Sequence, residues 1–313
     1  MTIPTRVLGR TGAKVPVLGY GAMELRGQFS GQASQLSGPA ITDQDAGRLL
    51  NELLDAGISL IDTSVDYGRS EELIGRYLSS RRSEYFLASK CGCPLSLSPG
   101  ESLLGAHDFS AANVRADVEQ SLRRLQTDHL DLVQVHLSPS RSEMEAGGTI
   151  DALEGLRAAG KIRFTGMSGT LPNLPDHIDM GVFDVFQIPY SALQPDHDEL
   201  ITRAADAGAG VLIRGAVARG TASEDKHWTV QPLSSSGPSA QDRWEAAGLD
   251  ELLEEGMSRH EFILRFTLSH PALSSTIVGT SSLDHLRGNL AIAEKGPLPA
   301  DLYQRAKDAL QPA

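Results

Sequence analysis

Short runs of consecutive apolar residues alternate along the chain with longer segments in which apolar residues recur at helical spacing. An unbroken apolar run is typical of a strand that is covered on both faces, because such a strand has no solvent-facing side. Strands are predicted at residues 17–21, 58–61, 85–89, 131–135, 164–167, 182–188, 210–213 and 275–278. Helices are predicted at residues 43–54, 70–78, 110–125, 149–159, 198–207, 258–268 and 282–293.

Local signals support several of these boundaries. Asp43 is predicted to cap the first helix, and Ser258 with Glu261 three residues later is the pattern of a capping box. Before the first buried strand, two short runs within residues 7–15 are joined through Thr11-Gly12, which predicts a small hairpin.

Eight buried strands separated by helices predict a parallel sheet, and eight is the number at which such a sheet closes into a barrel. An open doubly wound sheet is the alternative, but Gly19 and Gly21 are followed by neither the third glycine nor the helix of its signature. Two surplus segments, residues 24–40 and 215–256, would lie at the C-terminal mouth. We therefore expect one α/β domain over residues 1–313: a (β/α)8 TIM barrel with an N-terminal β-hairpin and long mouth loops.

Composition narrows the functional classes. The chain has 313 residues, 40 acidic against 28 basic, and a net charge of -12 without any Lys/Arg-rich block. Such a balance repels nucleic acid and anionic membranes, so neither is expected as a partner. Neither a signal peptide nor an apolar run of about 18 residues is visible, which suggests a cytoplasmic protein. Cys91 and Cys93 are expected to be reduced thiols, and no metal site is expected, because no further ligands lie at metal-binding spacing.

Polar residues follow three consecutive predicted strands. Asp62 ends the second strand and Tyr67 comes five residues later, while Lys90 and His136 follow the third and fourth strands. Each residue alone has a structural explanation, such as a helix cap or a solvated side chain. Because strand ends meet at one rim of a barrel, the four together indicate a catalytic site.

These residue types suit acid catalysis by a phenol. A free tyrosine, with a pKa near about 10, donates a proton poorly at neutral pH. A neighbouring Lys90 would lower the pKa of Tyr67, and Asp62 would keep Lys90 charged. His136 could orient a carbonyl oxygen or relay a proton. Since none of the four is a nucleophile, the electrons must come from a cofactor.

The motifs that contain these residues resemble those of the aldo-keto reductases, in the family's order and over roughly residues 6 to 295. The matching segments are Leu18–Met23, Ile61–Gly68, Lys90, Asp128–His136, Lys161–Ser168, Gln187–Ser191 and Val278–Ser282. The resemblance implies a barrel whose base is closed by the hairpin, and reduction of a small-molecule aldehyde or ketone by NAD(P)H. It also implies the tetrad Asp62, Tyr67, Lys90 and His136, with Tyr67 as the proton donor.

The resemblance further implies where the cofactor lies. Ser168 and Gln187 would hold the nicotinamide amide, although the family's usual Asn after this Ser is Gly169 here. Arg214 would stack on the nicotinamide ring. The full set of implied cofactor positions is Gly21, Met23, Asp62, Ser168, Gln187, Arg214, Gly215, Val217, Gly279, Thr280, Ser281, His285 and Asn289.

Cofactor choice stays open between NADP (NADPH) and NAD. Relatives that prefer NADPH place Lys or Arg near Gly279, Ser281 or His285, and here the nearest cation is Arg287. NADPH is expected on the resemblance, with NADH as the alternative. A second hypothesis is a cofactor-binding regulatory subunit that keeps the tetrad. Trp228 and Trp244 fall in the second surplus segment, where they either line the substrate pocket or pack within the loop. Substrate identity and oligomeric state are not predicted.

Overall fold

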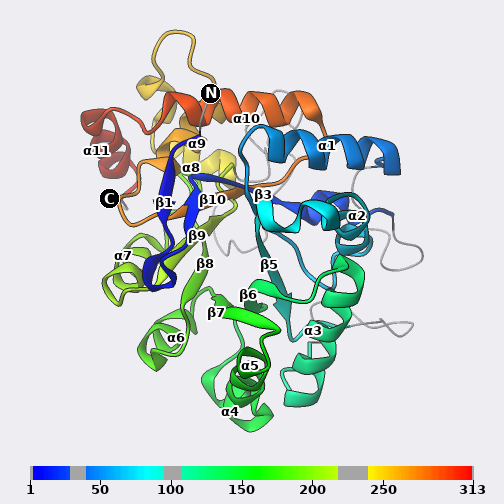
Figure 1. Ribbon diagram of the computed structural model, residues 1–313. Helices are drawn as coiled ribbons and strands as arrows, with labels where there is room; N and C mark the ends of the chain where they lie inside the picture. The colour runs from blue at the N-terminus through cyan, green and yellow to red at the C-terminus, as the bar shows by residue number, and fades with distance from the viewer. Residues whose placement is uncertain (1–2, 29–39, 95–106, 218–238, 312–313) are drawn as a thin grey trace.

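A closed barrel of eight parallel strands surrounded by helices forms the core of the computed structural model (Figure 1), which describes residues 3–28, 40–94, 107–217 and 239–311. The barrel order is β10-β3-β4-β5-β6-β7-β8-β9, so the predicted TIM barrel is confirmed. Its strands are β3 (Leu18–Gly21), β4 (Leu60–Asp62), β5 (Phe86–Cys91), β6 (Leu130–Val135), β7 (Ile162–Ser168), β8 (Val185–Pro189), β9 (Gly210–Arg214) and β10 (Ser275–Val278).

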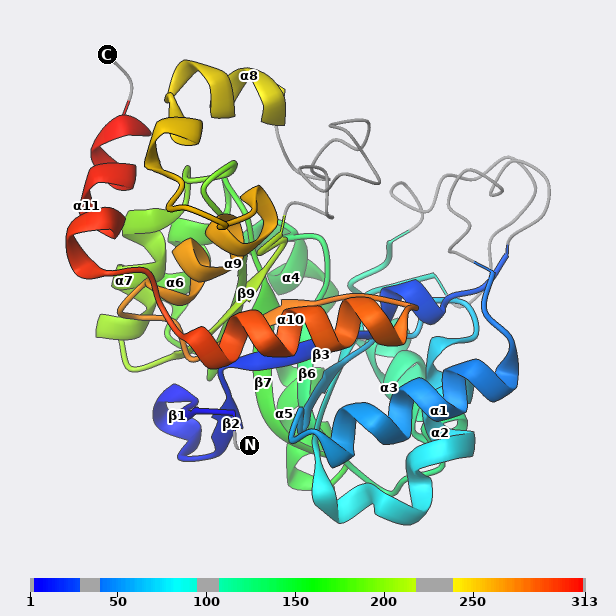
Figure 2. The same ribbon diagram turned by 90° about the horizontal axis from the view of Figure 1, so that it is seen from above.

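Helices cover the outside of the barrel. They are α1 (Asp43–Asp55), α2 (Ser70–Leu78), α3 (Ala111–Leu125), α4 (Arg141–Gly147), α5 (Thr149–Ala158), α6 (Leu174–Met180), α7 (Asp198–Asp206), α8 (Ala240–Ala246), α9 (Arg259–Leu268), α10 (Leu283–Lys295) and α11 (Ala300–Ala309). Figure 2 shows α10 running beside α1, and Arg287 of α10 forms an ion pair with Glu52 of α1.

The structure adds helices that the pattern did not predict: α4, α6, α8 and α11. Three of them have only seven residues, which is too short for a helical period to stand out. The predicted cap of α1 is also wrong, because Thr42, not Asp43, accepts a hydrogen bond from the Asp45 amide at 3.1 Å. Trp244 is buried in α8, whereas residues 29–39 and Trp228 lie outside the described residues.

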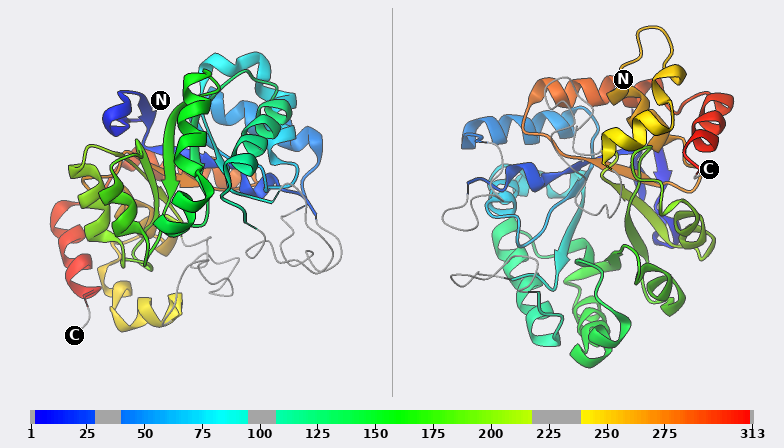
Figure 3. Two further views of the ribbon diagram at one scale, coloured as in Figure 1. Left: turned by 90° about the horizontal axis from the view of Figure 1, so that it is seen from below. Right: turned by 180° about the vertical axis from the view of Figure 1, so that it is seen from behind.

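A hairpin of β1 (Thr5–Val7) and β2 (Lys14–Pro16) closes the base of the barrel, as predicted. Leu8 and Val15 are buried against apolar side chains inside the barrel. Gly9 has a φ of +49°, and a Cβ at this position would lie 2.1 Å from the amide nitrogen of Gly210, so only glycine fits. Figure 3 shows the hairpin and α8 at opposite ends of the barrel.

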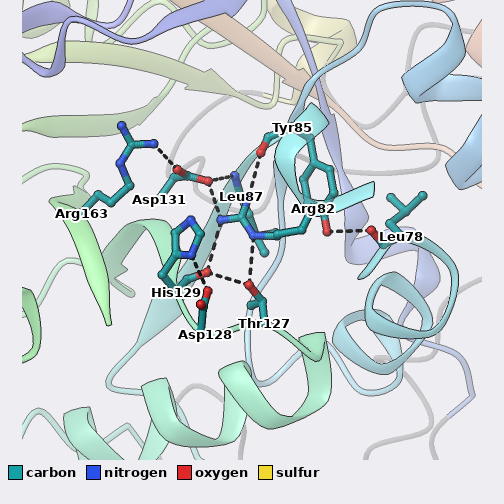
Figure 4. A network of polar contacts seen from close by, with 9 residues as sticks. All are labelled: Leu78, Arg82, Tyr85, Leu87, Thr127, Asp128, His129, Asp131 and Arg163. Atoms are coloured by element: carbon teal, nitrogen blue, oxygen red, sulfur yellow. Dashed lines mark hydrogen bonds and ion pairs between the residues drawn. The ribbon is translucent and has the colours of Figure 1, made fainter. Parts of the chain in front are cut away.

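The buried carboxylate of Asp131 connects the N-terminal ends of β5, β6 and β7 through hydrogen bonds at the base of the barrel (Figure 4). Asp131 Oδ2 accepts hydrogen bonds from the Leu87 amide at 2.9 Å and from Arg82 Nη2 at 2.6 Å, while Oδ1 accepts from Arg163 Nη1 at 2.7 Å. Asp131 therefore positions strands, at the end of the barrel that serves stability in this fold.

Candidate active site

The four predicted catalytic residues come together at the C-terminal mouth. Asp62 is the last residue of β4, Lys90 lies in β5 and His136 directly follows β6. Tyr67 lies in the loop between β4 and α2. Because β4, β5 and β6 are parallel neighbours, their ends deliver the side chains to one place.

An ion pair between Lys90 and Asp62 is the centre of this group. Lys90 Nζ lies 2.7 Å from Asp62 Oδ2 and donates to the Thr63 carbonyl at 2.7 Å. Lys90 is only 2% exposed, so it is buried and not a solvated rim residue. Burial is the largest single influence and by itself would lower the pKa of Lys90. The charge and hydrogen bond of Asp62, together with Tyr67 and Asp66, outweigh burial and raise this pKa, so the ammonium is retained.

The second oxygen of Asp62 is also occupied. Asp62 Oδ1 accepts hydrogen bonds from Gln134 Nε2 at 2.8 Å and Gln187 Nε2 at 2.9 Å. Gln134 was not among the predicted site residues, although its place two residues before His136 on β6 was a signal that it points to the same side of the strand. The two amides hold the carboxylate in its orientation toward Lys90.

Tyr67 lies against the ammonium. Lys90 Nζ is 4.8 Å from the centre of the Tyr67 ring. Burial raises the pKa of Tyr67 to about 12, and the charge of Lys90 counteracts this only in part, because Asp62 and Asp66 act in the opposite direction. Lys90 therefore lowers this pKa as predicted, but burial, which the sequence did not reveal, outweighs Lys90 and the net shift is upward. The phenol is fully protonated at neutral pH.

His136 completes the group and is neutral. Its ring meets that of Tyr67 edge-on, with centroids 6.2 Å apart. Burial lowers the pKa of His136 to about 3, although Asp66 opposes this shift. Nδ1 lies 3.2 Å from Cys93 Sγ and 3.6 Å from Asp66 Oδ2. The other ring nitrogen, Nε2, is therefore the one available to a substrate.

The predicted nicotinamide contacts are adjacent. Ser168 of β7 and Gln187 of β8 are partners in register, and both are buried. A Cβ at Gly169 would lie 2.7 Å from Leu174 Cδ1, so a larger residue here would require the Leu174 side chain to move.

The guanidinium of Arg214, at the end of β9, lies near the four predicted catalytic residues. Burial lowers its pKa, whereas the charges of Tyr67 and Asp62 act against that shift. Arg214 Nε is buried and has no hydrogen-bond partner within the described part of the chain. Gly215 follows with a φ of +72°, and Val217 is buried.

The predicted adenosine side lies at the ends of β3 and β10. A Cβ at Gly279 would lie 2.9 Å from the carbonyl oxygen of Gly21, so this turn requires a small residue. Thr280 Oγ1 accepts from the Ser282 amide at 3.0 Å. The remaining positions differ in exposure: Met23 is half-buried, His285 is exposed, and buried Asn289 lies 2.8 Å from His260 Nε2.

A surface hollow of about 320 Å³ opens at the N-terminus of α10. Ser281 and Arg287 line it together with Asp45 and Asp284. Arg287 Nε donates to Glu52 Oε1 at 2.8 Å, so part of its charge is already neutralised.

Comparison with known proteins defines the class. Residues 17–311 match the aldo/keto reductase family, and the chain belongs to this family of oxidoreductases, whose general reaction is carbonyl reduction with a nicotinamide cofactor. Among the described residues, no helix has the length and apolar character needed to cross a bilayer.

Individual relatives are similar over nearly the whole chain. L-galactose dehydrogenase of Arabidopsis thaliana is 30% identical, covering 92% of this chain and 88% of the relative. D-threo-aldose 1-dehydrogenase of a Pseudomonas species is 25% identical, covering 95% of each. The holo form of an aldo-keto reductase from Bacillus halodurans is 29% identical with a TM-score of 0.82, covering 99% of this chain and 97% of that structure.

Proposed function

We propose that this protein reversibly reduces an aldehyde or ketone to an alcohol, with NADPH as hydride donor and Tyr67 as proton donor. The observation that carries the proposal is the buried Asp62–Lys90 ion pair beneath Tyr67, with neutral His136 beside the phenol. This arrangement protonates an oxygen and offers no nucleophile.

Each residue has a separate task. The bound cofactor supplies hydride to the carbonyl carbon. Tyr67 donates its phenolic proton to the carbonyl oxygen, and Lys90 stabilises the phenolate that remains. Asp62 keeps Lys90 charged and in place. His136, engaged at Nδ1, presents Nε2 to orient the carbonyl oxygen.

The residues at the mouth fit a dinucleotide. Ser168 and Gln187 offer the polar groups that an amide needs, and Gln187 can exchange its contact with Asp62 for the cofactor. The planar guanidinium of Arg214, whose Nε has no hydrogen-bond partner among the described residues, suits an aromatic ring. A side chain at Gly279 would clash with the carbonyl oxygen of Gly21, so glycine allows the turn that leads into α10, whose N-terminal amides suit a phosphate.

The preference for NADPH over NADH is expected to be modest. Ser281, Arg287 and the N-terminus of α10 favour a 2′-phosphate. Asp45 and Asp284 line the same hollow and repel it.

The test is a substrate panel assayed with both cofactors in both directions. Because two relatives are named as sugar dehydrogenases, the panel contains aldoses together with simple aldehydes and ketones. Turnover of at least one class supports the proposal. Tight cofactor binding without turnover of any compound would instead support a regulatory subunit.

A further inference from the structure

Four potential metal ligands lie together beside the tetrad. They are Asp66 from the loop after β4, Cys93 after β5, His107 before α3 and His136 after β6. Each offers one ligand atom, and all four atoms lie within 4.8 Å of one another. These residues are far apart in sequence, which is why metal-ligand spacing gave no signal.

The distances are close to those of a tetrahedral zinc site. His136 Nδ1 lies 3.2 Å from Cys93 Sγ and 3.6 Å from Asp66 Oδ2, and His107 Nε2 lies 3.9 Å from the same carboxylate oxygen. Zinc bonds of about 2.0–2.3 Å place tetrahedral ligands about 3.3–3.6 Å apart. Side-chain shifts of about 1 Å or less therefore bring the atoms of each pair to the separation that two ligands of one tetrahedral zinc ion have.

The surroundings of the cluster are those of an enclosed site. The side chains of Asp66 and His107 are each 5% exposed, and Cys93 is completely buried. Asp66 Oδ1 is buried without a hydrogen-bond partner among the described residues. A buried carboxylate with an unsatisfied oxygen is costly unless a cation or donor reaches it.

We propose that Asp66, Cys93, His107 and His136 bind one Zn²⁺ ion as a closed tetrahedral site. Four protein ligands leave no open position for water or substrate, so the metal is structural and not a Lewis acid. It joins the loops that follow β4, β5 and β6. By bonding Nδ1 of His136, it also fixes the proton on Nε2, the nitrogen that faces the substrate.

The donor set selects the metal. Thiolate and imidazole are ligands for Zn²⁺ and its close relatives, whereas Mg²⁺ and Ca²⁺ prefer oxygen. The carboxylate and the thiolate together balance the charge of a divalent ion, which an enclosed site requires.

Metal binding to the purified protein, stripped by a chelator and free of cofactor and substrate, tests the proposal. Isothermal titration with Zn²⁺ is expected to give one site per chain, and Mg²⁺ is expected to give none. Titration with Co²⁺ should produce a near-ultraviolet thiolate-to-metal band. Absence of stoichiometric Zn²⁺ binding overturns the proposal.

Two variants locate the site. Cys93→Ser is expected to weaken Zn²⁺ binding by roughly 100-fold or more, since even residues that only support a ligand cost about 10–100-fold. Cys91→Ser is the matched control, because Cys91 is an equally buried free thiol outside the cluster, and it should keep wild-type affinity. His107→Gln is the second variant, independent of any thiol, and should also weaken binding. Unchanged affinity in both Cys93→Ser and His107→Gln places the metal elsewhere and refutes the assignment.

Thermal stability gives a second readout. Because zinc binds the folded chain, it should raise the Tm of the wild type and of Cys91→Ser, and should not raise that of His107→Gln. Neither measurement involves turnover, so failure of the metal site is distinguishable from failure of the proposed reductase reaction.

Discussion

At the scale of single residues, burial decides which groups of the candidate active site carry charge. Lys90 and Asp62 are both buried, yet they remain an ion pair because each compensates the other at 2.7 Å. Tyr67 and His136 are compensated only in part, by Lys90 and by Asp66 respectively, so burial keeps both of them neutral. The site therefore holds the Lys90 ammonium and the Arg214 guanidinium beside a protonated phenol.

Replacing Tyr67 with Phe should remove the proton donor while preserving the ring. We expect kcat for reduction to fall by roughly 10²–10⁴-fold, the usual contribution of a general acid. Cofactor affinity, measured by fluorescence titration, should stay nearly unchanged. Wild-type kcat in this variant would mean that another group donates the proton.

The raised pKa of Tyr67, about 12, predicts opposite pH dependences for the two directions. Reduction needs the protonated phenol, which persists below this pKa. Titration of Tyr67 should therefore leave kcat/KM for reduction constant through neutral pH. Oxidation of the alcohol needs the phenolate, whose population rises about tenfold per pH unit below the pKa. Its kcat/KM should therefore still be rising at pH 9. A plateau for oxidation near neutral pH would contradict this assignment.

The proximity of Asp62, Tyr67, Lys90 and His136 could be predicted from the sequence, because three of them lie at or directly after a recognisable strand end and Tyr67 follows five residues after Asp62. The depth of Lys90 and the direction in which the pKa of Tyr67 moves could not, since both depend on how much solvent the folded neighbours exclude. Asp66, Cys93 and His107 were also missed, because their proximity arises only when the loop after β4 meets the loop after β5.

At the scale of elements, the two ends of the barrel strands have different roles. The C-terminal ends of β4, β5 and β6 carry the tetrad, whereas Asp131 fixes the beginnings of β5, β6 and β7. Strand positions are readable from the sequence because the strands are unbroken apolar runs. Helices α4, α6 and α8 are not, because seven residues show barely two turns and tertiary packing determines whether they form.

Asp131→Ala should destabilise the base of the barrel. The buried Leu87 amide and the partly buried Arg82 would lose an acceptor that is 3% exposed, and a hydrogen bond to a charged group is worth about 1.5–3 kcal/mol. Arg163 is 55% exposed and should add little. Urea unfolding of Asp131→Ala and of the matched control Asp128→Ala measures the difference. Asp128 is exposed, and its removal should change stability by less than about 0.5 kcal/mol. Equal effects in the two variants would show that the network contributes nothing specific.

Ser281→Arg at the N-terminus of α10 should strengthen NADPH binding selectively. A guanidinium in the hollow can bind a 2′-phosphate, and a hydrogen bond to a charged group is worth about 1.5–3 kcal/mol, or roughly 10- to 150-fold in affinity. NADH, which has a hydroxyl there, should gain little. The ratio of the two dissociation constants, measured at low and high salt, checks this. An unchanged ratio at low salt would place the 2′-phosphate away from Ser281.

At the scale of the whole molecule, buried titratable groups make stability depend on pH in opposing ways. Burial raises the pKa of Glu71 to about 7, so stability is greatest while it is protonated and declines as pH rises from about 4.5 through 7. His136, with its pKa lowered to about 3, acts in the other sense: stability declines as pH falls below about 6.5. The maximum of stability lies where the two trends meet.

Glu71→Gln should move that maximum toward higher pH. The amide can keep a contact with Ser89, whose hydroxyl donates to Glu71 at 2.8 Å, without requiring a proton. The decline in stability between pH 5 and 7.5 should shrink by a few kcal/mol. Each unit by which folding raises the pKa of a group corresponds to about 1.4 kcal/mol of stability. Tm across this pH range is the measurement, with exposed Glu72→Gln as the control. A pH profile identical to that of the control would show that Glu71 does not titrate in this range.

The closed base has a consequence for how the chain is made. The hairpin leaves the ribosome early, but Arg10 donates its amide to Gly208 at 2.8 Å and Arg6 donates to Leu273 at 2.7 Å, both near the far end of the barrel sequence. Strand β3 likewise cannot complete its pairing in the barrel until β10 has been synthesised. Until translation has passed Val278, the edges of the nascent sheet remain unpaired and the hairpin cannot complete its contacts at the base. The apolar interior of the barrel is then exposed to chaperones and to neighbouring chains.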